Sequence, residues 1–131
     1  MLATNVVADL ARNPGGRAAS RIERLGSRPI AISGIVACEI EFSLAKAGRA
    51  RLASNVRQVV DGLEVLPLPA SVPQHYAEIR RALERKGTPI GPNDLLITAH
   101  ARALGLTLVT SNEREFTRVA GLAVENWLAE A

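Results

Sequence analysis

Short apolar runs alternate along the chain with stretches in which apolar residues recur every three or four positions. The runs are typical of buried strands, and the spaced stretches are typical of amphipathic helices. The predicted strands are Leu2–Val7, Pro29–Ser33, Leu63–Leu66, Leu106–Thr110 and an edge strand at Leu122–Glu125. The predicted helices are Gly16–Leu25, Gly34–Gly48, Arg51–Gly62, Val72–Lys86, Asn93–Leu104 and Glu113–Val119.

Two kinds of residue mark the ends of these helices. Ser33 is suited to cap the helix that begins at Gly34, because a serine hydroxyl accepts a hydrogen bond from a free N–H of the first turn. Gly48 and Gly105 directly follow predicted helices, where the left-handed conformation that glycine tolerates commonly ends a helix.

Strands separated by helices predict right-handed crossovers and a mostly parallel sheet covered on both faces. The fold class is therefore α/β, with three layers in the order helix, sheet, helix. The chain of 131 residues is the length of one domain. The Pro/Gly clusters at Asn13–Gly16, Pro67–Pro69 and Gly87–Pro92 are short loops, so we expect a single domain over residues 1–131.

The amino-acid composition limits the kinds of core and metal site that the chain can have. Aromatic residues make up only 3% of the chain, so its core must be aliphatic. The single cysteine, Cys38, excludes an internal disulfide and a cysteine-based zinc site. Two histidines, His75 and His100, do not favour a histidine-rich metal site, and we expect neither to be a catalyst. Hard metal ions with oxygen ligands remain open.

The net charge is +3, and nearly all of the positively charged residues are arginines. Arginines recur at helical spacing at 17, 21, 24 and 28, and again at 80, 81 and 85. Such groups are ordinarily solvated helix faces, but they also suit RNA phosphates or an acidic partner. No apolar stretch is long enough to span a membrane, and the first residues lack the pattern of a signal peptide, so we expect a cytoplasmic location.

Polar side chains gather where the predicted strands end, and in parallel sheets ligands bind at that edge. Glu39 lies one turn into a helix, on a stripe with Ile35 and Phe42, where a carboxylate is costly unless it is paired. It could form a salt bridge with an arginine, or act as a ligand or general base. Asp94 begins a helix whose Ile97 and Ala101 should pack on the sheet. It could cap that helix or bind a hard metal ion.

The fourth predicted strand, Leu106–Thr110, is followed by a second polar group. Thr110 and Asn112 could form a turn and a helix cap, while Glu113 and Glu115 fit the charge preference of a helix start. Either glutamate could instead add a carboxylate to the cluster. A phosphate-binding glycine loop and the elbow of serine hydrolases are both missing from the sequence.

These residues resemble a known family. The opening Leu2-Ala3-Thr4-Asn5 is similar to the Leu-Asp-Thr-Asn start of PIN-domain proteins, and Ile32 to Glu39 resembles their second motif. Ile90 to Ala101 and Leu108 to Phe116 resemble the third and fourth motifs. The ending Val124-Glu125-Asn126-Trp127 is also similar. The resemblance covers nearly the whole chain and is strongest to the VapC toxins of bacterial VapBC toxin–antitoxin pairs.

The resemblance implies a Mg²⁺- or Mn²⁺-dependent endoribonuclease that a VapB-type antitoxin neutralises. It implies that Glu39 and Asp94 bind the metal and that Thr4, Asn5 and Thr110 organise the site. It also implies an RNA substrate and a homodimer. DNA would be bound only indirectly, through the antitoxin.

Two departures from the family pattern matter. Ala3 stands where the family has its first aspartate, and a methyl group cannot bind a cation, so we expect this chain to be catalytically inactive. The intact motif around Ala3 favours a deliberate inactivating substitution. Asn112 stands where many relatives have aspartate, and Glu115 or Glu113 could supply the missing charge.

Two alternatives remain beside the ribonuclease. The chain could be a binding module with a PIN fold that holds an antitoxin and joins a repressor complex. A phospho-acceptor receiver domain is disfavoured, because Ala3-Thr4-Asn5 and Pro67-Leu68-Pro69 stand where its aspartates are needed.

Overall fold

The computed structural model describes residues 1–26, 28–48 and 50–129. Its helices are α1 (Thr4–Arg12), α2 (Arg17–Leu25), α3 (Gly34–Ala47), α4 (Ala50–Asp61), α5 (Val72–Arg85), α6 (Pro92–Leu104) and α7 (Glu113–Phe116). Its strands are β1 (Ala31–Ser33), β2 (Glu64–Leu66), β3 (Leu108–Val109) and β4 (Val124–Glu125). The expected α/β class is confirmed.

The strands form a parallel sheet in which the first residues of the chain are the middle element. Strand β1 pairs with β2 and strand β3 with β4, both in parallel. Leu2 joins the two pairs: its N–H donates to the Ala31 carbonyl at 2.9 Å, and it forms a parallel bridge with Val109. The expected edge strand at Leu122–Glu125 is confirmed in its last two residues, as β4.

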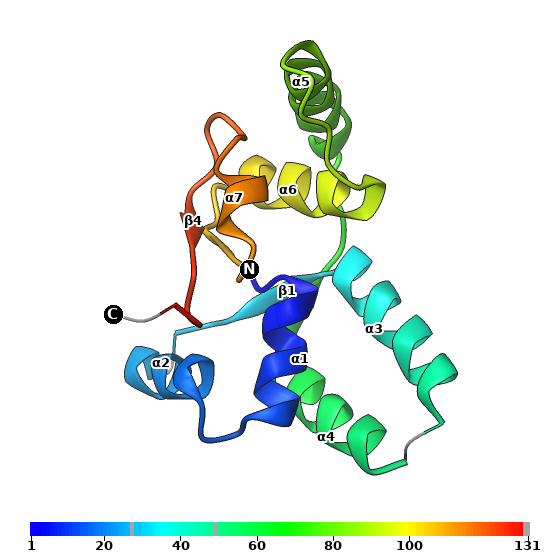
Figure 1. Cartoon of the computed structure of the whole chain (residues 1–131), viewed down its shortest axis with the longest axis vertical. Helices are drawn as coiled ribbons and strands as arrows, with labels where there is room; N and C mark the ends of the chain where they lie inside the picture. Colours follow the sequence, from blue (N-terminus) through cyan, green and yellow to red (C-terminus); the bar gives the residue numbers. More distant parts are fainter. Residues whose placement is uncertain (27, 49, 130–131) are drawn as a thin grey trace.

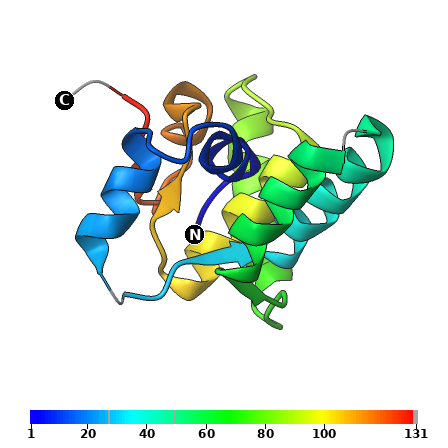
Figure 2. The ribbon, with the colours of Figure 1, turned by 90° about the horizontal axis from the view of Figure 1, so that it is seen from below.

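Helices cover both sides of this sheet. In Figure 1, α5, α6 and α7 lie on the opposite side of β1 from α1, α2 and α4, and Figure 2 shows the same arrangement from below. The larger core cluster lies around the sheet and is aliphatic apart from Phe116 and Trp127. A smaller one, which includes Leu83 and Val119, lies between α5 and α6.

The predicted strand Leu2–Val7 is wrong beyond its first residues, because helix α1 begins at Thr4. Val6, Val7, Leu10 and Ala11 are all buried on one face of α1, which is the spacing of an amphipathic helix. A short apolar run fits a strand or a buried helix equally well, and here the buried residues beyond Val7 decide for the helix. Ala3 is the extended residue at the N-cap position.

The predicted helix ends are confirmed. The Ser33 hydroxyl accepts a hydrogen bond from the Ile35 N–H at 3.1 Å, and Gly48 and Gly105 are left-handed with φ of 58° and 65°. The helix expected at Glu113–Val119 is shorter, because α7 ends at Phe116 and the chain then turns, with the Val119 N–H donating to the Phe116 carbonyl. No helix of the described residues is long and apolar enough to cross a membrane.

Candidate acidic site

The carboxylate of Glu39, in the second motif, is held by a residue of the first motif. The Thr4 hydroxyl, on the first residue of α1, donates a hydrogen bond of 2.7 Å to Glu39 Oε1 on α3. The expectation that apolar neighbours enclose Glu39 is wrong, because Phe42 is 65% exposed and Cys38 is exposed too. The core face of α3 is the one that carries Val36 and Ile40, so Glu39 lies at its border, half-buried.

Asp94 lies in the first turn of α6, half-buried, and Gly91 occupies the N-cap position. As expected, Ile97 and Ala101 on the same side of the helix are buried in the core. Partial burial and the neighbouring Glu115 carboxyl raise the pKa of Asp94 to about 6, and the charge of Glu39 adds to the effect. The structure therefore brings together carboxylates from α3, α6 and α7 that are far apart in the sequence.

The two glutamates of α7 have different surroundings. Glu115 faces Asp94, and its Oε2 accepts a hydrogen bond of 2.5 Å from the Asn112 side-chain amide. Glu113 Oε1 instead accepts from the Asn126 amide at 2.9 Å. Asn112 does occupy the N-cap position of α7, but its side chain is turned toward Glu115.

Thr110 and Asn5 join the loop before α7 to the start of α1. Thr110 is fully buried, and its hydroxyl accepts hydrogen bonds from the Asn5 side-chain amide (3.3 Å) and from the Asn112 N–H (3.1 Å). The Asn5 side-chain oxygen accepts from the Ser111 N–H at 3.3 Å. Both residues thus fix the backbone that carries Asn112 and Glu115.

Ala3 lies at the end of the central Leu2 segment, directly before Thr4 and Asn5. It is 5% exposed, and its N–H donates to the Val109 carbonyl at 2.8 Å. Its backbone is therefore fixed between two halves of the sheet. A side chain at this position starts from the same strand ends as Thr110, and the methyl group of Ala3 brings no ligand atom there.

The acidic residues form an open set of oxygen ligands. Within residues 1–26, 28–48 and 50–129, no three His, Cys, Asp or Glu side chains converge closely enough to enclose a metal ion. Mg²⁺ usually keeps several waters and takes only one or two protein carboxylates, so Asp94 and Glu39, with Glu115 beside Asp94, fit a partly hydrated hard cation. Burial and the neighbouring carboxyls raise the pKa of Asp94, and a bound cation would favour its charged form again.

Neither histidine belongs to this acidic group. His100 is buried, and its Nδ1 lies 2.8 Å from the Ser33 hydroxyl. His75 lies in the first turns of α5, within the predicted helix Val72–Lys86. Cys38 is exposed on α3.

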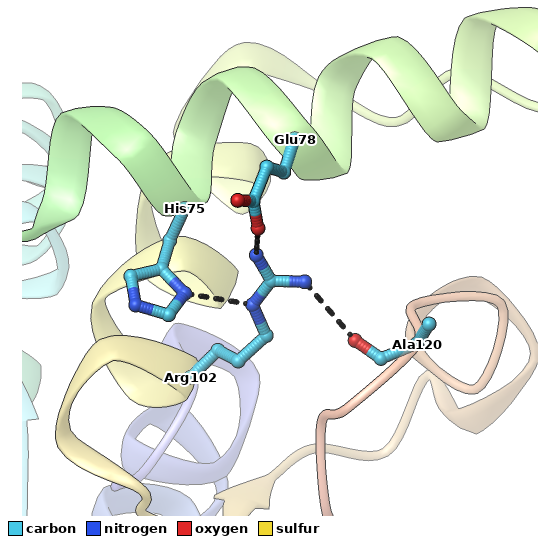
Figure 3. Close-up of polar contacts among 4 residues, drawn as sticks. All are labelled: His75, Glu78, Arg102 and Ala120. Atoms are coloured by element: carbon cyan, nitrogen blue, oxygen red, sulfur yellow. Dashed lines mark hydrogen bonds and ion pairs between the residues drawn. The ribbon is translucent and has the colours of Figure 1, made fainter.

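Sequence reasoning missed an arginine that joins three segments. Arg102, near the end of α6, donates hydrogen bonds to His75 and Glu78 on α5 and to the Ala120 carbonyl in the turn after α7 (Figure 3). The sequence held no signal for it, because neither arginine group that its spacing picked out includes position 102.

Comparison with known proteins places this arrangement in a family. The chain matches the PIN domain over residues 1–122. It is 40% identical over 99 residues to Ribonuclease VapC2 of Rickettsia felis, covering 75% of this chain and 74% of that protein. It is 36% identical to the tRNA(fMet)-specific endonuclease VapC of Salmonella typhimurium, covering 97% of this chain and 96% of that protein.

The fold agrees with solved structures of this kind. The crystal structure of VapBC2 from Rickettsia felis bound to a DNA fragment from their promoter matches with a TM-score of 0.90 and 36% identity, covering 97% of both chains. Similarity in sequence and in fold thus extends over the strands and helices that carry the acidic residues. The chain belongs to the PIN-domain family, among its VapC-like members.

Proposed function

We propose that this chain has the site of a Mg²⁺- or Mn²⁺-dependent endoribonuclease of the VapC type, with RNA as its substrate. The observation that carries the proposal is the placement of Glu115 on α7 beside Asp94 on α6, with Glu39 on α3 near enough to act on the pKa of Asp94. Such a group is unfavourable in the folded chain unless it serves a cation, because like charges in a half-buried site repel one another. The similar proteins, which are named as a ribonuclease and a tRNA endonuclease, support RNA cleavage as the reaction.

In this site Asp94 and Glu39 would hold the metal ion, and Thr4 would keep the Glu39 carboxylate oriented toward it through the 2.7 Å hydrogen bond. When bound, the cation supplies an activated water and stabilises charge on the scissile phosphate. Glu115 would accept a hydrogen bond from that water, while Asn112 fixes its carboxylate. Thr110 and Asn5 hold the loop in place.

Ala3 makes this chain, as it stands, an inactive form of the site. The backbone at position 3 is fixed between Val109 and the start of α1, so an aspartate placed there would extend from the same edge of the sheet as the other ligands. Its absence removes one carboxylate from a set that is already open. Mg²⁺ depends on few protein carboxylates, so losing one should weaken binding strongly.

The path that we propose for the RNA strand is a basic groove near the loop that carries Glu115. Residues of α2 and the C-terminal segment line a hollow that includes Arg21, Arg24, Asn126 and Trp127. Asn126 also contacts Ser111 and Glu113, so the groove reaches the loop that carries Glu115. Arginine suits phosphate oxygens, which supports this groove as the path of the RNA backbone.

A VapB-type antitoxin is the proposed protein partner, and the similar Rickettsia felis structure is of a VapBC2 assembly on promoter DNA. The chain would reach DNA only through such a partner and would act as a homodimer. Phe42, 65% exposed on α3, is an apolar side chain that a partner could cover. Because Ala3 removes a ligand, the second candidate is a non-catalytic module that binds the antitoxin and acts as a co-repressor.

The test is RNA cleavage with Mg²⁺ or Mn²⁺ by this chain and by Ala3→Asp, each with an EDTA control. The expected result is cleavage by Ala3→Asp alone, abolished by EDTA and by adding Asp94→Asn. If Ala3→Asp is inert but co-purifies with a small partner, the binding module is the correct function.

A further inference from the structure

Arg102 uses its whole guanidinium group to join three segments. Its Nε donates to His75 Nδ1 at 2.8 Å, its Nη2 to Glu78 Oε2 at 2.6 Å and its Nη1 to the Ala120 carbonyl at 3.2 Å. The His75 and Glu78 side chains reach toward it from α5, and Ala120 lies on its far side (Figure 3). Because an arginine can only donate, His75 must carry its proton on Nε2 here.

The side chain is well enclosed for an arginine. It is 16% exposed, whereas Glu78 is 59% exposed, so the ion pair lies at the border of the core. The stem of Arg102 packs on Gly121, where an added Cβ would stand 3.5 Å from Arg102 Cδ. Gly121 has a φ of 76°, so the turn itself is of a kind that favours glycine.

The turn that Arg102 holds is the continuation of α7. The Thr117 N–H donates to the Glu113 carbonyl at 2.9 Å, and the Val119 N–H donates to the Phe116 carbonyl at 3.1 Å. Val119 is buried against α5 and α6. A contact that restrains Ala120 therefore also restrains Glu115, because a hydrogen-bonded turn joins the two residues.

The segment formed by α7 and the turn after it thus meets α6 at two places. Near the start of α6, Glu115 on α7 lies close to Asp94. Eight residues later, a distance of about 12 Å along a helix, Arg102 donates a hydrogen bond to the Ala120 carbonyl in the turn.

We propose that Arg102 is a positioning residue of the acidic site: by holding the turn after α7 against α5 and α6, it fixes Glu115 beside Asp94. This rests on the proposed function only in the roles given there to Asp94, as a metal ligand, and to Glu115, as the acceptor for the activated water. A guanidinium with three differently placed acceptors can do this, and the single ammonium group of lysine cannot.

The test compares Arg102→Met with Arg80→Met, both in the Ala3→Asp background. Methionine keeps much of the apolar stem in each case. Arg80 is a matched control, since it donates to Glu84 and Tyr76 within α5 and its side chain is 56% exposed. The two readouts are amide hydrogen exchange at Thr117 and Val119, and Mn²⁺ affinity by titration calorimetry.

Arg102→Met should speed exchange at both amides at least tenfold and weaken Mn²⁺ binding about fivefold, somewhat less than the loss of a residue that directly supports a ligand. Arg80→Met should change neither. Unchanged Thr117 exchange, or unchanged Mn²⁺ affinity, would overturn the proposal and leave Arg102 as a tie between α5 and α6 alone.

A second variant and a second readout test the proposal if the main comparison fails. If Arg102→Met does not fold, Glu78→Gln removes the ion pair and leaves the other two contacts, so it should produce a smaller change of the same kind in both readouts. If the Ala3→Asp parent itself binds no Mn²⁺, the proposed function fails on its own. The Thr117 exchange rate then still decides whether Arg102 holds α7.

Discussion

The Thr4 hydroxyl donates a hydrogen bond of 2.7 Å to the carboxylate of Glu39, 35 positions away in the chain. Hydrogen bonds to charged groups contribute about 1.5–3 kcal/mol, and less where the pair is partly exposed. Thr4→Val keeps the shape of the side chain and removes the donor. In the Ala3→Asp background we expect RNA cleavage to fall about tenfold in kcat/KM, because Glu39 loses its orientation.

Thr4→Ser is the matched control for this pair, since it restores a hydroxyl at the same place. Its kcat/KM should stay within about twofold of the parent, as the donor to Glu39 is kept. Equal loss in both variants would show that the methyl group of Thr4, rather than its hydroxyl, matters to the site.

The two glutamates of α7 should differ in their effect on RNA cleavage. Glu115 faces Asp94, whereas Glu113 is bonded to Asn126. In the Ala3→Asp background, Glu115→Gln should lower kcat at least tenfold through loss of a charge at the reacting water. Glu113→Gln should stay within about twofold, because glutamine can still accept from Asn126. Single-turnover cleavage of one RNA checks both, and equal losses would contradict the assignment.

Removing a carboxylate from the metal-free site should stabilise the fold. Burial and its acidic neighbours raise the pKa of Asp94 from 3.8 to about 6, so stability is lost as the pH rises from the lower of these values through the higher one. Allowing for solvent screening, Asp94→Asn should add on the order of 1 kcal/mol to the free energy of unfolding at pH 8. Urea unfolding in EDTA measures this. The control is Glu113→Gln, and a destabilised Asp94→Asn would contradict the repulsion.

His100 should make stability depend on pH in the opposite direction. Burial lowers the pKa of His100 below its usual 6.5, and the nearby Pro67 backbone only partly opposes this. The unfolded chain therefore binds a proton that the folded chain does not, so stability is lost as the pH falls below about 6.5. The stability advantage of the parent over His100→Gln should shrink between pH 7.5 and 5.5. An advantage that grows would contradict the buried neutral imidazole.

The arginines of the groove lined by α2 should contribute to the salt dependence of RNA binding. Binding that neutralises phosphates weakens with salt in proportion to the number of contacts. Arg21→Gln with Arg24→Gln should lower both affinity and salt slope for an RNA bound in EDTA. Arg81→Gln with Arg85→Gln removes the same charge from α5 and should change neither. Equal effects would favour simple attraction to a basic protein.

The sequence predicted most of the fold where local chemistry decides it. Ser33, Gly48 and Gly105 end their helices through their own hydroxyl or their lack of a side chain, and each was expected to. Leu2–Val7 failed because an apolar run does not by itself reveal its period. The buried residues that decide it, Leu10 and Ala11, come only after the run ends.

The sequence singled out the candidate site residues but not their contacts, and the roles of these residues stay predictions. Asp94 and Glu39 follow from strand ends and the family resemblance, while the choice between Glu113 and Glu115 depends on where α7 turns. Phe42 is exposed, although its place on the same stripe as Ile35 predicts burial. Arg102 was invisible, since its three acceptors lie in segments whose approach depends on tertiary packing.

The most direct measurement is Mn²⁺ binding, without RNA, to this chain, to Ala3→Asp and to Ala3→Asp with Asp94→Asn, by titration calorimetry at one pH. We predict that Ala3→Asp binds at least tenfold more tightly than the chain as it stands, and that Asp94→Asn removes the gain. Equal affinity of the first two would contradict the account, because position 3 would then not belong to a metal site.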